Sequence, residues 1–173
     1  MTRKPVVAII GGSSADDALL RVAHDVGAGL VNAGYRVATG GLGGVMTSAS
    51  QGARRAERWQ DGDVIGVLPG AVAGDANPYV DVVIPTGMGI ARNIVLVQTA
   101  DVVVAVGGGS GTLSEMAFAW QLGKPIVALD VGEGWSAKLA GTALDARRAD
   151  TVIGVKTAEQ VLTAVETLLS GAR

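Results

Sequence analysis

The sequence has no cysteine and only one histidine, His24. Without thiols the chain cannot form disulfides, iron–sulfur clusters or cysteine zinc sites, and it has no thiolate nucleophile. One histidine provides too few ligands for a histidine zinc site. A Ser–His–Asp triad would have to use this same histidine as its base. We expect His24 to be a surface or packing residue of the first helix, and we expect no metal site.

Charge and long apolar runs are also scarce. Charged residues make up 17% of the 173 residues, and the net charge of −2 argues against a broadly basic nucleic-acid-binding protein. No apolar run approaches the roughly 18 residues of a membrane span. Residues 6–10 follow Arg3 and Lys4 as in a signal peptide, but the run is shorter than the about 7–15 apolar residues of an export signal. We expect a cytoplasmic protein with no membrane or nucleic-acid partner.

Short apolar runs alternate with longer amphipathic segments along the chain. The predicted strands are 6–10, 35–39, 64–68, 80–84, 102–106, 126–129 and 151–155. The predicted helices are 16–32, 45–57, 90–99, 112–122 and 158–169. This alternation predicts parallel strands joined by right-handed crossovers, and continuously apolar strands predict a sheet buried on both faces. We therefore predict one domain over residues 1–173, an α/β, doubly wound, Rossmann-like, mostly parallel sheet with helices on both faces, in a three-layer sandwich.

Glycine is over-represented, with 26 positions, about twice its usual share of roughly 7%. Three clusters each follow a predicted strand, namely Gly11-Gly12-Ser13-Ser14, Gly40-Gly41-Leu42-Gly43-Gly44 and Gly107-Gly108-Gly109-Ser110-Gly111-Thr112. Ligands of open α/β sheets bind beyond the carboxyl ends of the strands, where glycine lets backbone amides approach an anion. The clusters therefore favour an anion site over the alternative that they serve only tight turns and packing.

The known nucleotide motifs do not identify the anion. A Walker A loop is absent. The dinucleotide fingerprint also fails, because Met46 stands where its last glycine would follow Gly41 and Gly43. Thr39 and Gly40 occupy the end of the second strand, where an NAD-binding protein carries an acid. An NAD-dependent oxidoreductase is therefore a weak interpretation.

Two charged residues lie at predicted helix starts near the same sheet edge. Glu115 follows the third cluster, where Thr112-Leu113-Ser114-Glu115 also fits a capping box whose acid only bonds a backbone amide. Arg92 lies at the unfavourable end of a helix dipole, which suggests a phosphate or carboxylate partner; a surface position is the alternative.

The run from Arg92 to Glu115 resembles the signature of the LONELY GUY superfamily, often labelled lysine decarboxylase-like. Its hallmark Pro-Gly-Gly-x-Gly-Thr-x-x-Glu is similar to residues 107–115, residues 40–46 resemble its other glycine loop, and the similarity covers about residues 6–129. The resemblance implies a Rossmann-like fold that usually forms homodimers. In the enzyme branch it implies hydrolysis of the N-glycosidic bond of a nucleoside 5′-monophosphate, with no cofactor required and with Arg92 and Glu115 as the catalytic pair.

Together, the clusters and the resemblance predict a set of phosphate- or ligand-binding residues. They are Gly11, Gly12, Ser13, Gly40, Gly41, Gly43, Gly44, Met88, Arg92, Asn93, Gly108, Gly109, Ser110, Gly111 and Thr112.

Two positions depart from the hallmark, since its proline is Gly107 here and the lysine beside the arginine is Asn93. With the stretch 87–93, these departures are more similar to a sister branch that contains molybdenum-cofactor carrier proteins, which bind the phosphorylated pterin without transforming it. We therefore expect a carrier or storage protein with molybdopterin as cargo. The alternatives are a phosphoribohydrolase of nucleoside 5′-monophosphates and a regulatory nucleotide sensor.

Three further segments carry expectations. The helix around Trp120 looks apolar all round, so a two-fold dimer interface is a plausible cover for it. Arg54, Arg55 and Arg58 with Trp59 form a basic helix end that complements the helix dipole; the alternatives are that it steers phosphate or contacts a subunit. Residues 70–78 form a small, polar loop long enough to be a mobile flap.

Overall fold

The computed structural model describes residues 3–171, and all of its strands join one parallel sheet. The strands are β1 (Val6–Gly11), β2 (Arg36–Thr39), β3 (Val64–Leu68), β4 (Val82–Pro85), β5 (Val102–Val106), β6 (Ile126–Leu129) and β7 (Ile153–Val155). They pair in the order β4-β3-β2-β1-β5-β6-β7. The central β5 is buried along its whole length, which is why its sequence is continuously apolar and not alternating.

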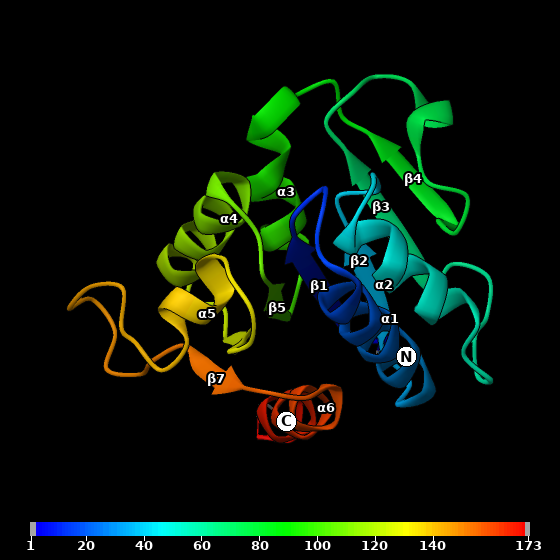
Figure 1. Cartoon of the computed structure of the whole chain (residues 1–173). Coiled ribbons are helices and arrows are strands. Elements are labelled where there is room, and N and C mark those ends of the chain that lie inside the picture. Colours follow the sequence, from blue (N-terminus) through cyan, green and yellow to red (C-terminus); the bar gives the residue numbers. More distant parts are fainter. Residues whose placement is uncertain (1–2, 172–173) are drawn as a thin grey trace.

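Helices cover both faces of the sheet (Figure 1). On one face lie α1 (Asp17–Asn32), α2 (Val45–Arg54) and α6 (Ala158–Ser170). On the other lie α3 (Arg92–Thr99), α4 (Ser110–Gln121) and α5 (Trp135–Leu139). The predicted three-layer α/β fold is therefore confirmed. Within residues 3–171, none of the helices combines the length and the hydrophobicity that a bilayer crossing requires.

The strand order reverses between β1 and β5. From β1 the chain proceeds through β2 and β3 to β4 on one side, whereas β5 leads to β6 and β7 on the other. Gly11 at the end of β1 pairs with Val106 at the end of β5, so the loops that follow these strands begin side by side. Such a reversal leaves a crevice at the carboxyl edge of a sheet, and two of the three glycine clusters lie there.

Two glycines let α1 and α2 touch backbone to backbone. A Cβ on Gly27 would lie 2.1 Å from the Ala49 carbonyl oxygen, and one on Gly52 would lie 1.9 Å from the His24 carbonyl oxygen. No side chain fits at either position, and the two helices pack at a distance that only glycine allows. The His24 side chain lies beside Asp25, outside the crevice.

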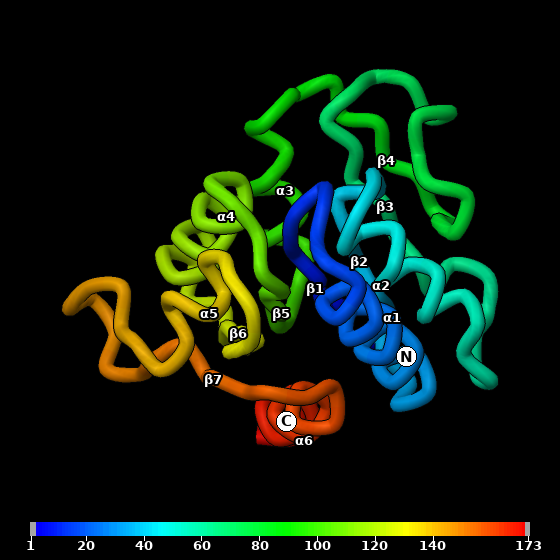
Figure 2. The backbone as a smooth tube through the Cα atoms, viewed as in Figure 1, coloured from blue at the N-terminus to red at the C-terminus, as the bar shows by residue number. Residues whose placement is uncertain are grey.

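Two segments differ from the sequence prediction. Between β3 and α3 the chain loops out at the top of the view (Figure 2) and includes the short 3₁₀ helices η1 (Ala73–Asp75) and η2 (Gly89–Ala91). The predicted helix 90–99 becomes α-helical only at Arg92, because Gly87 and Gly89 adopt positive φ angles of 64° and 57°. Between β6 and β7, the five-residue α5 was not predicted, since it is too short to show a helical period.

The predicted flap, residues 70–78, is fastened to the second glycine cluster. The Asn77 amide N–H donates to the Gly41 carbonyl at 2.8 Å, and Asn77 Nδ2 donates to the Leu42 carbonyl at 3.1 Å. One residue thus ties the loop to the segment after β2.

Trp120 is covered within its own chain. Its indole Nε1 donates to Asp145 Oδ1 at 2.9 Å, and the Arg148 guanidinium lies 4.5 Å from the ring centre. The apolar face of α4 that suggested a dimer interface is therefore covered at this position by the segment between α5 and β7. The expectation of a homodimer then rests on the family resemblance and not on this position of α4.

The basic end of α2 also serves contacts within the chain. Arg54 pairs with Asp81 and lies 4.3 Å from the centre of the Trp59 ring, while Arg58 Nη1 donates to the Asn32 carbonyl at 3.0 Å. These residues are not among those that line the main cleft.

Candidate functional site

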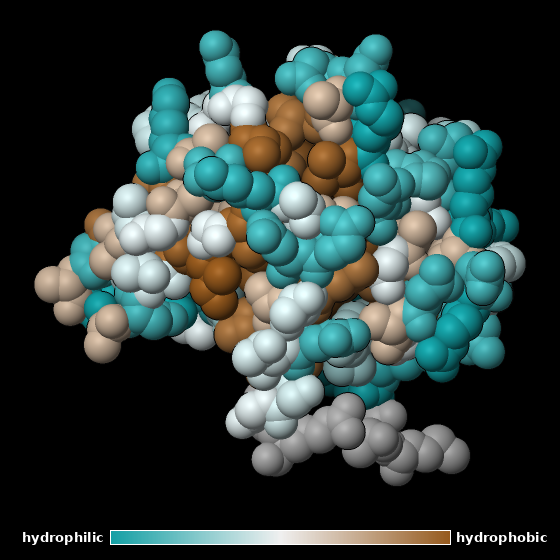
Figure 3. Space-filling model, turned by 60° about the horizontal axis from the view of Figure 1, so that its bottom comes forward, coloured by the Kyte–Doolittle hydropathy of each residue, from teal (hydrophilic) through white to brown (hydrophobic). Residues whose placement is uncertain are grey.

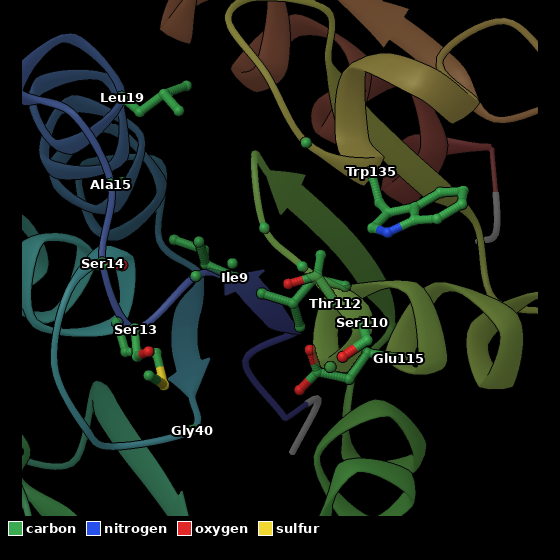
Figure 4. Close-up of a pocket in the computed structure, with 18 of the residues that line it drawn as sticks. Ile9, Ser13, Ser14, Ala15, Leu19, Gly40, Ser110, Thr112, Glu115 and Trp135 are labelled. Carbon is green, nitrogen blue, oxygen red and sulfur yellow. The ribbon is translucent and has the colours of Figure 1, made fainter.

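A cleft of about 1330 Å³ opens at the carboxyl edge of the sheet, where the strand order reverses. Figure 4 shows Ser13 and Ser14 on one wall, in the loop after β1, and Ser110 and Thr112 on the facing wall, at the start of α4. The volume exceeds that of most drug-sized pockets, so a nucleotide-sized ligand fits.

Figure 3 shows another face of the molecule, on which hydrophobic residues form small patches separated by hydrophilic ones.

The start of α4 faces open space. Ideal Cβ atoms built on Gly109 and Gly111 meet no atom within 4 Å, and Gly109, Ser110 and Gly111 are exposed. Gly109 is the N-cap of α4, and no side chain caps the helix there. The first backbone N–H groups of a helix have no partner within the helix, and together they form the positive end of its dipole. This end of the cleft therefore offers unpaired donors to an anion.

Most of the other predicted glycines have structural reasons to lack a side chain; Gly43, which does not line the cleft, is the exception. A Cβ on Gly11 would lie 2.6 Å from the Val106 carbonyl oxygen, and one on Gly108 would lie 2.1 Å from Thr112 Oγ1. For these positions, the interpretation as turn and packing residues accounts for the sequence. Gly109 and Gly111 have no such reason, so they carry the argument for a ligand.

An arginine–carboxylate pair lies among the buried residues that line the cleft. Arg92 Nη1 donates to Glu115 Oε1 at 3.0 Å and to Asn93 Oδ1 at 2.6 Å. Asn93 Nδ2 in turn donates to Ser114 Oγ at 3.0 Å, which links the start of α3 to α4. Among the described residues, Arg92 Nε is buried without a hydrogen-bond partner. The surface alternative for Arg92 is therefore wrong, and its partner is a carboxylate.

Gly40 makes room for this arginine. A Cβ on Gly40 would lie 2.4 Å from Arg92 Nη2 and 2.7 Å from Met46 Sδ. The second glycine cluster thus contributes to the site by admitting the guanidinium beneath the end of β2.

Glu115 does not form a capping box with Thr112. The helix begins at Ser110, so Thr112 lies inside its first turn, and the Glu115 carboxylate accepts its hydrogen bond from Arg92. Burial raises the pKa of the Glu115 carboxyl from its usual 4.5 to about 7, although the charge and the hydrogen bond of Arg92 act to lower it. A carboxyl with such a pKa gives up or accepts a proton near neutral pH.

Most of the predicted site residues lie together in the cleft. Those that line it are Gly11, Gly12, Ser13, Gly40, Arg92, Asn93, Gly108, Gly109, Ser110, Gly111, Thr112 and Glu115. Gly41, Gly43 and Gly44 lie in the loop after β2 but do not line the cleft, and Met88 is exposed beside η2. Whether these residues bind a ligand stays a prediction.

Sequence reasoning missed one wall of the cleft, which the loop between β6 and α5 and the helix α5 itself form. Its lining residues are Gly132, Glu133, Gly134, Trp135, Ala137 and Lys138. A signal was present, because Gly132 and Gly134 follow a strand just as the three recognised clusters do. Asp16, at the N-cap of α1, was also missed as a lining residue.

Comparisons with known proteins agree with the fold and with the family resemblance. The model of the SLOG cluster4 family matches residues 4–162. The molybdenum cofactor binding protein of the phototrophic bacterium Rippkaea orientalis has a similar structure, with a TM-score of 0.84, 33% identity and coverage of 98% of this chain and 99% of that protein. The Moco carrier protein of Chlamydomonas reinhardtii is similar with a TM-score of 0.80, 33% identity and the same two coverages.

An uncharacterised protein of Archaeoglobus fulgidus is 37% identical over 123 residues, which cover 71% of this chain and 78% of that relative. The matches confirm the family resemblance predicted from the run between Arg92 and Glu115.

Proposed function

The chain belongs to the SLOG cluster4 family, and we propose that its cleft binds a phosphorylated, nucleotide-like small molecule. The ligand that we put first is the molybdenum cofactor, held as cargo. Two proteins named for binding or carrying this cofactor support the choice, because each aligns with nearly the whole chain.

The observation that carries the proposal is the open start of α4. Gly109 and Gly111 leave the first backbone N–H groups of the helix uncovered, and the Ser110 and Thr112 hydroxyls lie beside them. A phosphate at this position would accept hydrogen bonds from these groups and lie at the positive end of the helix dipole.

The acids that line the cleft are compatible with an anionic ligand. Asp16 Oδ1 is engaged as the cap of α1, where it accepts from the Leu19 amide at 2.8 Å. Glu115 is paired with Arg92, and its raised pKa makes it only partly ionised at neutral pH. Glu133, the third acid of the lining, is exposed, so solvent and salt screen its charge. The repulsion between these three carboxylates and a phosphate is therefore smaller than their number suggests.

The test is retention of the cofactor by the purified protein. We expect the wild type to keep molybdopterin through anaerobic gel filtration, and Gly109→Ala to weaken binding about tenfold, because its methyl group would enter the space left for the phosphate. Gly74→Ala is the matched control, since Gly74 in η1 also has open space around it but lies outside the cleft. Equal retention by both variants, or none by the wild type, would contradict the proposal.

A second candidate function is hydrolysis of the N-glycosidic bond of a nucleoside 5′-monophosphate. The Arg92–Glu115 pair favours it, because a buried carboxyl with a pKa of about 7 suits proton transfer at neutral pH. In that reaction Glu115 would stabilise an oxocarbenium-like centre or orient the attacking water, and Arg92 would anchor and polarise the substrate.

Free base released from AMP and related monophosphates, followed by chromatography, separates the two functions. Turnover that Glu115→Ala abolishes and Glu133→Ala preserves would establish the hydrolase, since Glu133 is an exposed glutamate of the same cleft. Absence of turnover, together with retained molybdopterin, would leave the carrier function alone.

We also propose that the protein forms a homodimer. Large hydrophobic side chains are exposed around η2 and the start of α3, among them Met88, Ile90 and Ile94, with Ile90 89% exposed. Such side chains grouped on one surface often mark a protein–protein contact. Sedimentation at micromolar concentration should give a dimer that Ile90→Asp dissociates; a wild-type monomer would contradict this.

A further inference from the structure

The cleft contains an aromatic side chain that the functions above do not use. Trp135, in the first position of α5, is partly exposed and is the one aromatic residue among the described residues that line the cleft. Aromatic residues are only 3% of the chain, so its position in the cleft calls for an explanation. Figure 4 shows it on the same wall as Ser110 and Thr112.

The three tryptophans of the chain each have a cation over the ring, but they differ in what their indole N–H groups contact. The Trp59 and Trp120 indole N–H groups donate to Asp81 and Asp145 at 3.0 and 2.9 Å, and an arginine lies over each ring. These two rings hold parts of the fold together. Trp135 differs, because within residues 3–171 its indole N–H has no hydrogen-bond acceptor.

The backbone that carries Trp135 is fixed to the third glycine cluster. The Trp135 amide donates to the Gly108 carbonyl at 3.0 Å, and the Ser136 amide donates to the Gly107 carbonyl at 3.1 Å. The buried Ser136 hydroxyl accepts from the Gly107 amide at 2.7 Å and donates to the Leu129 carbonyl at 2.9 Å. A Cβ on Gly134 would lie 2.6 Å from the Gly107 carbonyl carbon, so only glycine permits this approach.

These contacts hold the backbone of Trp135 in a fixed relation to the start of α4. A ligand whose phosphate lies at Gly109 and Gly111 would therefore have an aromatic surface beside it. The Lys138 ammonium, 4.9 Å from the centre of the Trp135 ring, adds a positive charge on the same wall. Planar heterocycles stack on indole rings through dispersion and electrostatic attraction, largely independently of their substituents.

We propose that Trp135, with Lys138 beside it, forms the subsite for the planar, fused heteroaromatic ring of the ligand. This inference rests on the proposed function, because it takes the phosphate to lie at the start of α4. Trp135 contributes affinity for the ring, whereas Gly109, Gly111 and the adjacent hydroxyls contribute affinity for the phosphate. The ligand class is therefore a purine- or pterin-like ring joined to a phosphate ester.

The test compares ligands with and without a ring. We would titrate the wild type, Trp135→Ala and Trp135→Phe with AMP, with molybdopterin and with ribose 5-phosphate, which has the phosphate but no ring, and follow free base in the same samples. We expect Trp135→Ala to weaken the binding of AMP and molybdopterin about 10- to 100-fold, the range that a base–aromatic stack provides. The affinity of Trp135→Ala for ribose 5-phosphate should change less than about twofold. Trp135→Phe should keep most of the affinity for the ligands that carry a ring.

Tryptophan fluorescence gives a second measurement. Ligands that carry a ring should quench the fluorescence of the wild type and of a Trp59→Phe control, because Trp59 lies outside the cleft. They should not quench the fluorescence of Trp135→Phe. Unchanged affinity for AMP and molybdopterin in Trp135→Ala, or equal loss of ring and ringless ligands, would overturn the subsite and leave the phosphate site standing. If the wild type binds none of the ligands, the proposed function fails and the subsite fails with it.

Discussion

Two arginine–carboxylate pairs, each with a buried carboxylate, lie at opposite regions of this molecule, and they differ in how completely their atoms are hydrogen-bonded. At the β3–β4 side, the buried Asp81 carboxylate pairs with Arg54 and also accepts from Trp59 Nε1 and the Val64 amide, each at 3.0 Å. In the cleft, Glu115 accepts one hydrogen bond from Arg92, whose Nε is buried without a partner among the described residues.

The difference separates a structural pair from a candidate functional one. A buried charge that is fully hydrogen-bonded contributes to the fold and has no capacity left for a ligand. The pair of Arg92 and Glu115 has unused hydrogen-bonding capacity and a carboxyl pKa of about 7, and it lines a cleft of about 1330 Å³. Perturbed carboxyl groups in clefts are typical of functional sites.

The largest expected effect concerns the structural pair. Asp81→Ala removes the acceptor of three donors and should lower the free energy of unfolding by about 3 kcal/mol, the lower end for one lost partner of a buried pair, because Arg54 is partly exposed. Urea denaturation measures this loss. Asp81→Asn keeps the size and one acceptor, so it should lose less. A loss below about 1 kcal/mol for Asp81→Ala would remove the basis of the comparison.

The next effect concerns Glu115 and pH. Because the folded state raises the pKa of this carboxyl from 4.5 to about 7, the folded state binds the proton more tightly than the unfolded state does. Its contribution to stability is therefore fully present below pH 4.5 and is lost as the pH rises to about 7. With about 1.4 kcal/mol for each pKa unit, the loss is at most about 3 kcal/mol.

Glu115→Gln should lack this loss. The difference in free energy of unfolding between the variant and the wild type, measured by urea denaturation from pH 4 to pH 8, should move in favour of the variant as the pH rises. Glu166→Gln is the control, since Glu166 is an exposed carboxyl of α6 outside the cleft. A difference that stays constant across the range would show that the Glu115 carboxyl titrates normally.

A smaller effect concerns Gly40. A methyl group at this position would meet Arg92 Nη2 and Met46 Sδ, both at the flexible ends of side chains, so Gly40→Ala should cost about 1–2 kcal/mol of stability. Displacement of the guanidinium should also weaken the hydrogen bond that Arg92 donates to Glu115. Thermal unfolding measures the first consequence. An unchanged melting temperature would mean that the arginine shifts without loss.

The smallest effect on stability concerns Gly109. Its surroundings are open, so Gly109→Ala should change the free energy of unfolding by less than about 1 kcal/mol while weakening phosphate binding. Calorimetric titration with molybdopterin beside urea denaturation measures both quantities. Loss of stability without loss of binding would mean that Gly109, like Gly11, serves packing alone.

The sheet and its edge were predictable because their signals are local. Continuous apolar runs such as 102–106 can be satisfied only by a strand covered on both faces, and glycines after such runs mark the carboxyl edge. The family signature between Arg92 and Glu115 also lies in one stretch of sequence. Both the fold and the family are confirmed by the structure and the comparisons.

What the sequence did not reveal depends on contacts between distant segments. That Gly40 accommodates Arg92, that Trp120 is covered by Asp145 and Arg148, and that Glu115 binds an arginine in place of capping its helix all require tertiary structure. The wall that carries Trp135 was missed because α5 has only five residues and Gly134 stands in a loop without periodicity.

The backbone contact between α1 and α2 has a mechanical consequence for the cleft. Because Gly27 and Gly52 let each helix rest on the main chain of the other, sliding or separating them would break contacts that no side-chain rotation can restore. The loops ahead of both helices are therefore coupled and should shift as one body. Any widening of the entrance for a bulky ligand should therefore occur on the opposite side. There the Trp135 and Ser136 amides bond the carbonyls of Gly108 and Gly107, so α5 and the loop before α4 should move together.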